Sequence, residues 1–140
     1  MKTIALVAHD AKKDDLLHWV TEHADKLIGN KFYATGTTGK ILSSVLPGIN
    51  RLKSGPLGGD QQLGALISEG KIDYLIFFWD PMTSQPHDVD VKALLRLSVL
   101  YDVPTACNHA SADFLINSQL FGTEYKSTPE DYSDYLNRSL

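Results

Sequence analysis

The chain contains an unbroken run of large apolar side chains, Tyr-Leu-Ile-Phe-Phe-Trp, within residues 73–79. Successive side chains of a strand point to opposite faces, so a strand with one exposed face alternates apolar and polar residues. A strand that is apolar throughout must be covered on both faces, which is typical of parallel sheets with helices on either side. The run therefore predicts a central strand of a parallel α/β sheet.

The rest of the chain alternates predicted strands with helical patterns, as such a sheet requires. Four further strands are predicted, at residues 3–8, 31–35, 49–53 and 104–107. Helical spacing of apolar residues is found at residues 12–27, 38–45, 61–70, 89–101, 111–117 and 129–138. Right-handed crossovers between successive strands then give a single three-layer α/β domain over residues 1–140, with a five-stranded parallel sheet.

Composition excludes several classes of partner. The formal charge is −4 and no run of Lys or Arg could neutralise successive phosphates, which argues against nucleic acid as a ligand. No segment approaches the roughly 20 apolar residues of a membrane span, and the N-terminal apolar run is too short for a signal peptide. Cys107 is the only cysteine, fits a reducing compartment, and is predicted to be a small buried apolar residue. We therefore expect a cytoplasmic protein.

Chemically useful side chains follow nearly every predicted strand. In open α/β sheets, ligands bind beyond the carboxyl ends of the strands, where these residues would gather. The set that follows the five strands is His9, Asp10, Lys13, Thr35 to Gly39, Ser54, Gly55, Asp60, Asp80, His87, Asp88, Asp90, Asn108 and His109.

The turn Thr35-Gly36-Thr37-Thr38-Gly39 leads from a strand into a helix. Free N–H groups and three hydroxyls would converge there at the positive end of a helix dipole, which favours a phosphate group. The turn matches neither the P-loop pattern nor the dinucleotide-binding pattern, and an ordinary tight turn is the alternative. Lys13 and the Ser54-Gly55 pair would add a positive charge and further donors, which supports the interpretation as a phosphate site.

Asp60 has two competing interpretations. It directly precedes a helical run, where Asp is a preferred N-cap. The glycines before it and the phosphate-binding groups predicted around it favour a catalytic carboxylate instead. The two roles conflict, because a carboxylate that accepts capping hydrogen bonds has a lowered pKa and is a poorer base. The spacing of His87, Asp88 and Asp90 would suit a metal ion only with further oxygen ligands, and no second oxygen cluster joins them, so no metal and no cofactor are predicted. His18 and His23 are predicted to face solvent.

Five segments together resemble the bacterial methylglyoxal synthases over residues 3–116. They are Ala-Leu-Val-Ala-His-Asp (5–10), Tyr-Ala-Thr-Gly-Thr-Thr-Gly (33–39), Ser-Gly-Pro-Leu-Gly-Gly-Asp-Gln-Gln (54–62), Phe-Phe-Trp-Asp-Pro (77–81) and Pro-His-Asp-Val-Asp-Val-Lys-Ala-Leu-Leu-Arg (86–96). The resemblance implies a Rossmann-like fold, usually in a homohexamer, and a lyase that converts dihydroxyacetone phosphate to methylglyoxal and inorganic phosphate.

The resemblance also implies roles for individual positions. Asp60 occupies the position of the catalytic carboxylate. Substrate contacts are implied for His9, Lys13, Thr35, Gly36, Thr37, Thr38, Ser54, Gly55 and His87. As a base, Asp60 would remove a proton beside the ketone, and His87 would donate to the carbonyl oxygen as it gains charge.

Several roles stay open at this point. Asp10, Asp80 and Asp90 are either structural residues or supporting charges, and Asp80 and Asp90 are expected to raise the pKa of a neighbouring carboxyl. Product phosphate is expected to inhibit, since it would share the substrate's site. Asp10, Arg96 and Arg138 are candidates for ion pairs between subunits. A phosphosugar isomerase and a small-ligand regulatory module are the alternative functions.

Overall fold

The apolar run of the sequence forms β4 (Tyr74–Phe78), and all five of its residues are buried. A computed structural model describes residues 1–139 of the chain. Its sheet has five strands, all parallel, in the order β3-β2-β1-β4-β5. The remaining strands are β1 (Thr3–Ala8), β2 (Lys31–Ala34), β3 (Ile49–Arg51) and β5 (Thr105–Ala106). The predicted Rossmann-like α/β fold is therefore confirmed.

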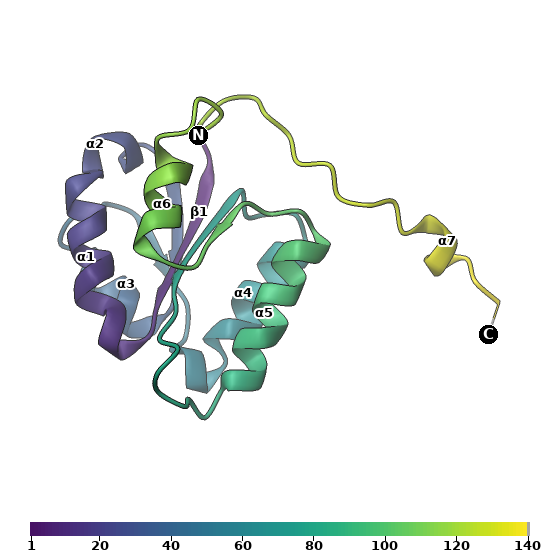
Figure 1. Cartoon of the computed structure of the whole chain (residues 1–140), viewed down its shortest axis with the longest axis horizontal. Coiled ribbons are helices and arrows are strands. Elements are labelled where there is room, and N and C mark those ends of the chain that lie inside the picture. The colour runs from purple at the N-terminus through teal and green to yellow at the C-terminus, as the bar shows by residue number, and fades with distance from the viewer. Residues whose placement is uncertain (140) are drawn as a thin grey trace.

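Helices cover both faces of the sheet (Figure 1). One face carries α1 (Lys13–Glu22), α2 (Ala24–Leu27), α3 (Gly36–Leu42) and α6 (His109–Ile116). The other carries α4 (Gly59–Ser68) and α5 (Asp88–Leu100). Two short 3-10 turns, η1 (Asp10–Lys12) and η2 (Gly55–Leu57), precede α1 and α4, and α7 (Ser133–Leu136) comes last.

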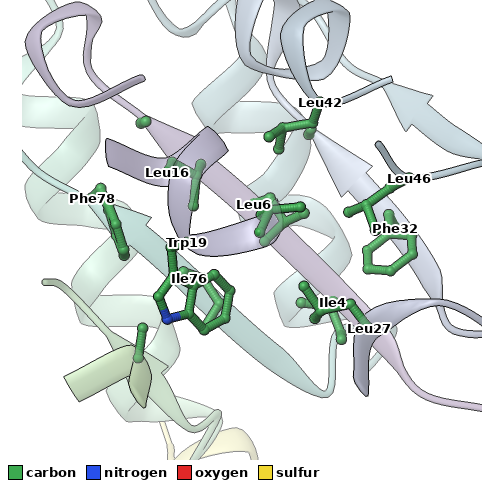
Figure 2. Packing of buried hydrophobic residues seen from close by; sticks show 14 of the residues in the cluster. Ile4, Leu6, Leu16, Trp19, Leu27, Phe32, Leu42, Leu46, Ile76 and Phe78 are labelled. Atoms are coloured by element: carbon green, nitrogen blue, oxygen red, sulfur yellow. The ribbon is translucent and has the colours of Figure 1, made fainter. Parts of the chain in front are cut away.

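Alternate side chains of β1 pack into two separate hydrophobic cores, one on each face of the sheet. Ile4 and Leu6 pack with Trp19 and other side chains of α1, α2, α3 and α6, as Figure 2 shows from close by. Ala5 and Val7 pack instead against α4 and α5. Each large apolar side chain buried in this way contributes about 1.5–3 kcal/mol, so the central strands hold the carboxyl edge of the sheet in a fixed geometry.

The prediction of one continuous helix at residues 12–27 is wrong, because the segment forms two helices, α1 and α2. It breaks at His23, which ends α1, and the His23 carbonyl then accepts from the N–H groups of Lys26 and Leu27 in α2. The imidazole Nδ1 of His23 lies 2.9 Å from the Trp19 carbonyl oxygen, and its side chain is mostly buried. The prediction that His23 faces solvent is therefore also wrong, whereas His18 is exposed.

The predictions fail most clearly after residue 122. The sequence predicts a helix at 129–138, but only α7 forms there, and none of the residues of α7 is buried. A short helix without a packed apolar face has little to stabilise it in water. In Figure 1 this yellow segment leaves the body of the molecule. No helix among residues 1–139 has the length and apolar character that crossing a membrane demands.

Candidate active site

The candidate site lies where the strand order of the sheet reverses, between the carboxyl ends of β1 and β4. This is the position at which open α/β sheets bind ligands. His9 follows β1 and Asp80 follows β4, and the two loops are tied together there. The His9 N–H donates to the Phe78 carbonyl (3.2 Å), and the Asp80 N–H donates to Nδ1 of His9 (3.0 Å).

A cavity of about 220 Å³ opens at this edge. It is lined by Val7, Ala8, His9, Asp10, Lys13, Thr35, Thr37, Thr38, Ser54, Gly55, Pro56, Asp60, Gln85 and His87. The structure thus brings most of the predicted site residues into one place. Gly36 is the exception among the residues predicted to bind substrate. Its N–H donates to the Lys53 carbonyl (3.2 Å), and it packs against the Ser54 backbone instead of facing the cavity.

Hydrogen-bond donors gather around the start of α3, where the sequence predicts a phosphate site. The N–H groups of Thr37 and Thr38 precede the first bond of the helix, which Gly39 donates to the Thr35 carbonyl (2.8 Å). The hydroxyl of Thr38 donates to the Ala8 carbonyl (3.3 Å). Lys13 adds a positive charge to the same wall. These donors suit an anion with several oxygens.

Asp60 lies in the first turn of α4 and is only 3% exposed. The N-cap residue of α4 is Gly58, and the buried Oδ2 of Asp60 has no hydrogen-bond partner among residues 1–139. Burial raises the pKa of the Asp60 carboxyl, the charge of Asp90 raises it further, and His87 opposes both. A carboxylate with a free oxygen and a raised pKa is suited to accept a proton.

His87 stands opposite Asp60, at the N-cap position of α5. Its Nε2 is 3.6 Å from Oδ2 of Asp60, and its buried Nδ1 has no partner within the described part of the chain. Gly55, in the segment after β3, packs against both His87 and Asp60. A Cβ added at Gly55 would lie 2.8 Å from Nε2 of His87 and 3.4 Å from Oδ2 of Asp60. Only glycine leaves both side chains in these positions.

His9 presents a defined tautomer to the cavity. Its Nδ1 accepts from the Asp80 N–H, so the neutral ring carries its proton on Nε2, which is buried without a partner in residues 1–139. Burial lowers the pKa of His9, and the nearby His87 lowers it further. His9 is therefore a neutral donor at pH 7, 5.6 Å from His87 between ring centroids.

The three supporting carboxylates have different surroundings. Asp10 is paired with Lys13, which lowers the pKa of the Asp10 carboxyl. Asp80 accepts from the Met82 N–H (3.0 Å), which lowers its pKa, and its charge acts on His9. Of the three carboxylates, only Asp90 raises the pKa of Asp60, as the sequence predicts. The expectation that Asp80 raises the pKa of Asp60 is not supported by this arrangement.

Some polar residues at the sheet edge do not belong to the cavity. Asn108 caps α6, where its side chain accepts from the Ser111 N–H (2.8 Å). His109 pairs with Asp113 at 3.4 Å. Within residues 1–139 no three His, Cys, Asp or Glu side chains form a group that could hold a metal ion. Cys107 follows β5 and is half-buried, and burial raises the pKa of its thiol.

Sequence reasoning missed Gln85 as a wall residue of the cavity. It lies in the connection between β4 and α5, well past the end of the strand. No helical or strand periodicity places a residue in such a loop, so only its closeness to His87 in the sequence could have indicated it.

Comparison with known proteins agrees with this geometry. A family model described as an MGS-like domain matches residues 15–107. The methylglyoxal synthase of Hahella chejuensis is 55% identical over 139 residues, covering 99% of this chain and 90% of its own. That of Vibrio cholerae is 57% identical over 136 residues, covering 96% and 90%.

A solved structure agrees as well. The crystal structure of methylglyoxal synthase from Elizabethkingia anophelis superposes with a TM-score of 0.92 at 54% identity, covering 99% of this chain and 92% of that one. Matches of this extent include every segment that forms the cavity. The chain therefore belongs to the methylglyoxal synthase family of enzymes.

Proposed function

We propose that the protein is a carbon–oxygen lyase that converts dihydroxyacetone phosphate to methylglyoxal and inorganic phosphate. The observation that carries the proposal is Asp60, a buried carboxylate with a free oxygen that faces a cavity rich in anion donors. The names of the relatives support the same reaction. The proposal needs no metal and no cofactor, and places the enzyme in the cytoplasm.

The first step is proton transfer to Asp60 from the hydroxymethyl carbon beside the ketone. The electron pair of that C–H bond moves into the new C=C bond, and the carbonyl oxygen becomes negative. We expect His87 and His9 to donate hydrogen bonds to that oxygen, because both side chains line the cavity. Donors that meet a developing charge lower the barrier only as far as they bind it more strongly in the transition state.

In the second step the terminal hydroxyl gives up its proton and its carbon becomes the aldehyde, while the C=C electron pair shifts to form a double bond to the carbon that carries the phosphate. The C–O bond to phosphate breaks, and its electron pair and the hydroxyl proton leave with the phosphate. The resulting enolate takes up a proton at its methylene carbon and becomes methylglyoxal. Lys13, Thr35, Thr37, Thr38 and the Ser54-Gly55 pair would stabilise the charge that grows on the departing phosphate. Gly36 would act only by packing against Ser54.

An isomerase acting on the same substrate has to avoid this elimination. Loss of phosphate requires the C–O bond to stand roughly perpendicular to the enediolate plane, so that its orbital overlaps the π system. We propose that the donors on the β2 and β3 side hold the phosphate in that position. The alternative functions are a phosphosugar isomerase and a regulatory module that binds a phosphorylated ligand.

Incubation with dihydroxyacetone phosphate separates the three functions. Methylglyoxal with equal phosphate supports the lyase, glyceraldehyde phosphate supports an isomerase, and binding without turnover supports a regulatory module. Inorganic phosphate is expected to inhibit by occupying the predicted phosphate site. A titration in which phosphate leaves the rate unchanged at every concentration would rule out that part of the proposal.

We also propose a homohexamer, in which Asp10, Arg96 and Arg138 form ion pairs between subunits. Large apolar side chains on the surface, among them Val99 and Phe114, are available for contacts between chains. Six chains of 15.5 kDa should sediment as a particle of about 93 kDa. A sedimentation mass of one chain would reject the assembly without affecting the proposed chemistry.

A further inference from the structure

The cavity has two ends of different chemistry, and the strand order separates them. Donors suited to phosphate follow β2 and β3, which lie on one side of β1. Gln85 and His87 belong to the connection after β4, which lies on the other side of β1. The two ends meet where Gly55 approaches His87 and Asp60. A three-carbon phosphate bound across the cavity therefore points its unphosphorylated end toward Gln85.

The backbone of Gln85 is held in place by Asp88 through two reciprocal hydrogen bonds. The Gln85 N–H donates to Oδ2 of Asp88 (3.0 Å), and the Asp88 N–H donates to the Gln85 carbonyl (3.2 Å). The two bonds close a turn over residues 85–88, just before α5. It fixes the point from which the Gln85 side chain enters the cavity wall.

The carboxamide of Gln85 has an unused acceptor. Its Nε2 makes a long hydrogen bond to the Thr83 carbonyl (3.4 Å), whereas Oε1 has no partner among the described residues. The side chain is partly exposed and lines the cavity together with His87. A neutral acceptor suits a hydroxyl group and would not attract a phosphate dianion.

We propose that Gln85 determines specificity by accepting a hydrogen bond from the terminal hydroxyl of the substrate. The inference rests on the proposed function, since that hydroxyl is carried by the carbon from which Asp60 takes the proton. The hydroxyl keeps its proton until the enediolate has formed, so the bond is made both in the ground state and in the transition state for proton abstraction. Gln85 thus contributes binding that is uniform up to the enediolate, which affects KM more than the rate of proton abstraction.

The test replaces Gln85 by Met, which has a similar length and no amide. Gln85→Met should raise KM for dihydroxyacetone phosphate about threefold to tenfold, the loss expected for one neutral hydrogen bond, and change kcat less than twofold. Gln119→Met is the matched control, because Gln119 is exposed and lies outside the cavity. Gln85→Leu serves as a second variant if Gln85→Met folds poorly.

A deoxy analogue identifies the group that is contacted. Acetol phosphate keeps the ketone and the phosphate but carries a methyl group in place of hydroxymethyl. Its inhibition constant should be the same for the wild type and Gln85→Met. An equal loss of affinity for acetol phosphate and for substrate would overturn the inference, because the contact would then lie elsewhere on the ligand.

Asp88 provides an independent check as the positioning residue. Asp88→Ala removes the acceptor that holds Gln85 and should raise KM in the same direction. Asp88→Asn keeps an acceptor oxygen and should restore KM, although both variants remove the charge that acts on His9. Wild-type turnover with no change of KM in Gln85→Met overturns this inference alone. Absence of wild-type turnover overturns the proposed function.

Discussion

The sequence offers Asp60 as a helix cap, but α4 begins one residue earlier, at Gly59, so Asp60 lies within the first turn of the helix. Gly58 provides the cap position of α4 with a φ of +107°, which favours glycine. A Cβ at Gly59 would lie 1.9 Å from the Lys53 carbonyl oxygen, so that position also requires glycine. The helix is thus started by backbone conformation, and the Asp60 carboxylate remains available to the cavity.

The buried Asp60 carboxylate is predicted to lower the stability of the folded protein at neutral pH. Because the folded state raises the pKa of Asp60, folding takes up a proton between its ordinary value of 3.8 and the raised value. Stability therefore falls as the pH rises through that window and stays lower above it. Asp60→Asn should raise Tm at pH 7 by about 3–5 °C, and the gain should shrink toward pH 3.8. A lower Tm at pH 7 in a calorimetric scan would contradict this explanation.

Gly55 is predicted to be as sensitive as the reacting side chains, because it leaves room for His87. The methyl group of Gly55→Ala would lie 2.8 Å from Nε2 of His87, too close for the imidazole to keep its position. A displacement of about 1 Å can cost about 10²-fold in kcat. Gly64→Ala is the control, since its methyl would meet only a Leu97 methyl at 3.1 Å and should leave kcat nearly unchanged. Equal rates for the two variants would argue against this packing role.

Asp90 is predicted to tune Asp60 through its charge. It lies in the groove between α4 and α5 that Asp60 also lines, and its charge raises the pKa of Asp60. Asp90→Asn should therefore move the acidic limb of the pH–rate profile to lower pH, because the base loses its proton more readily. Asp80→Asn should leave that limb in place, since the Asp80 charge acts on His9. An unchanged profile for Asp90→Asn would reject the role.

At the scale of elements, α6 is attached to α1 by a partly buried polar contact that periodicity did not predict. Trp19 is 1% exposed, and its indole N–H donates to Oδ1 of Asp113 (2.9 Å). His23 lies beside the same carboxylate at 3.7 Å. Amphipathic spacing predicts which helix faces are buried, but it cannot predict partners that are 94 residues apart along the chain.

Removal of the Asp113 carboxylate is predicted to weaken the fold without weakening the chemistry. Asp113→Ala leaves the buried indole N–H without an acceptor and should lower the free energy of unfolding by about 1–3 kcal/mol. Asp113→Asn retains an oxygen and should lose less. Urea unfolding followed by tryptophan fluorescence measures both variants. A loss of kcat in either variant would show that the contact reaches the cavity, which Asp113 does not line.

At the scale of the whole molecule, the sequence was most successful in predicting which residues meet at the carboxyl edge of the sheet, because the order of the strands decides this. The apolar run of β4 and the polar residues after each strand were enough to place His9, Asp60 and His87 at one edge. Gly36 was misplaced because its N–H is used to join two loops, and the two functions of a glycine in a turn look alike in sequence. Gln85 was missed because its position depends on how a long loop folds back.

The central claim is that Asp60 initiates the elimination of phosphate within one polar cavity. A ¹H and ³¹P NMR time course with dihydroxyacetone phosphate, run in parallel on the wild type and Asp60→Asn, measures this most directly. We expect the wild type to release methylglyoxal and phosphate in equal amounts, and Asp60→Asn to bind the substrate without turning it over. Turnover by Asp60→Asn near the wild-type rate, or glyceraldehyde phosphate as the product, would contradict the account.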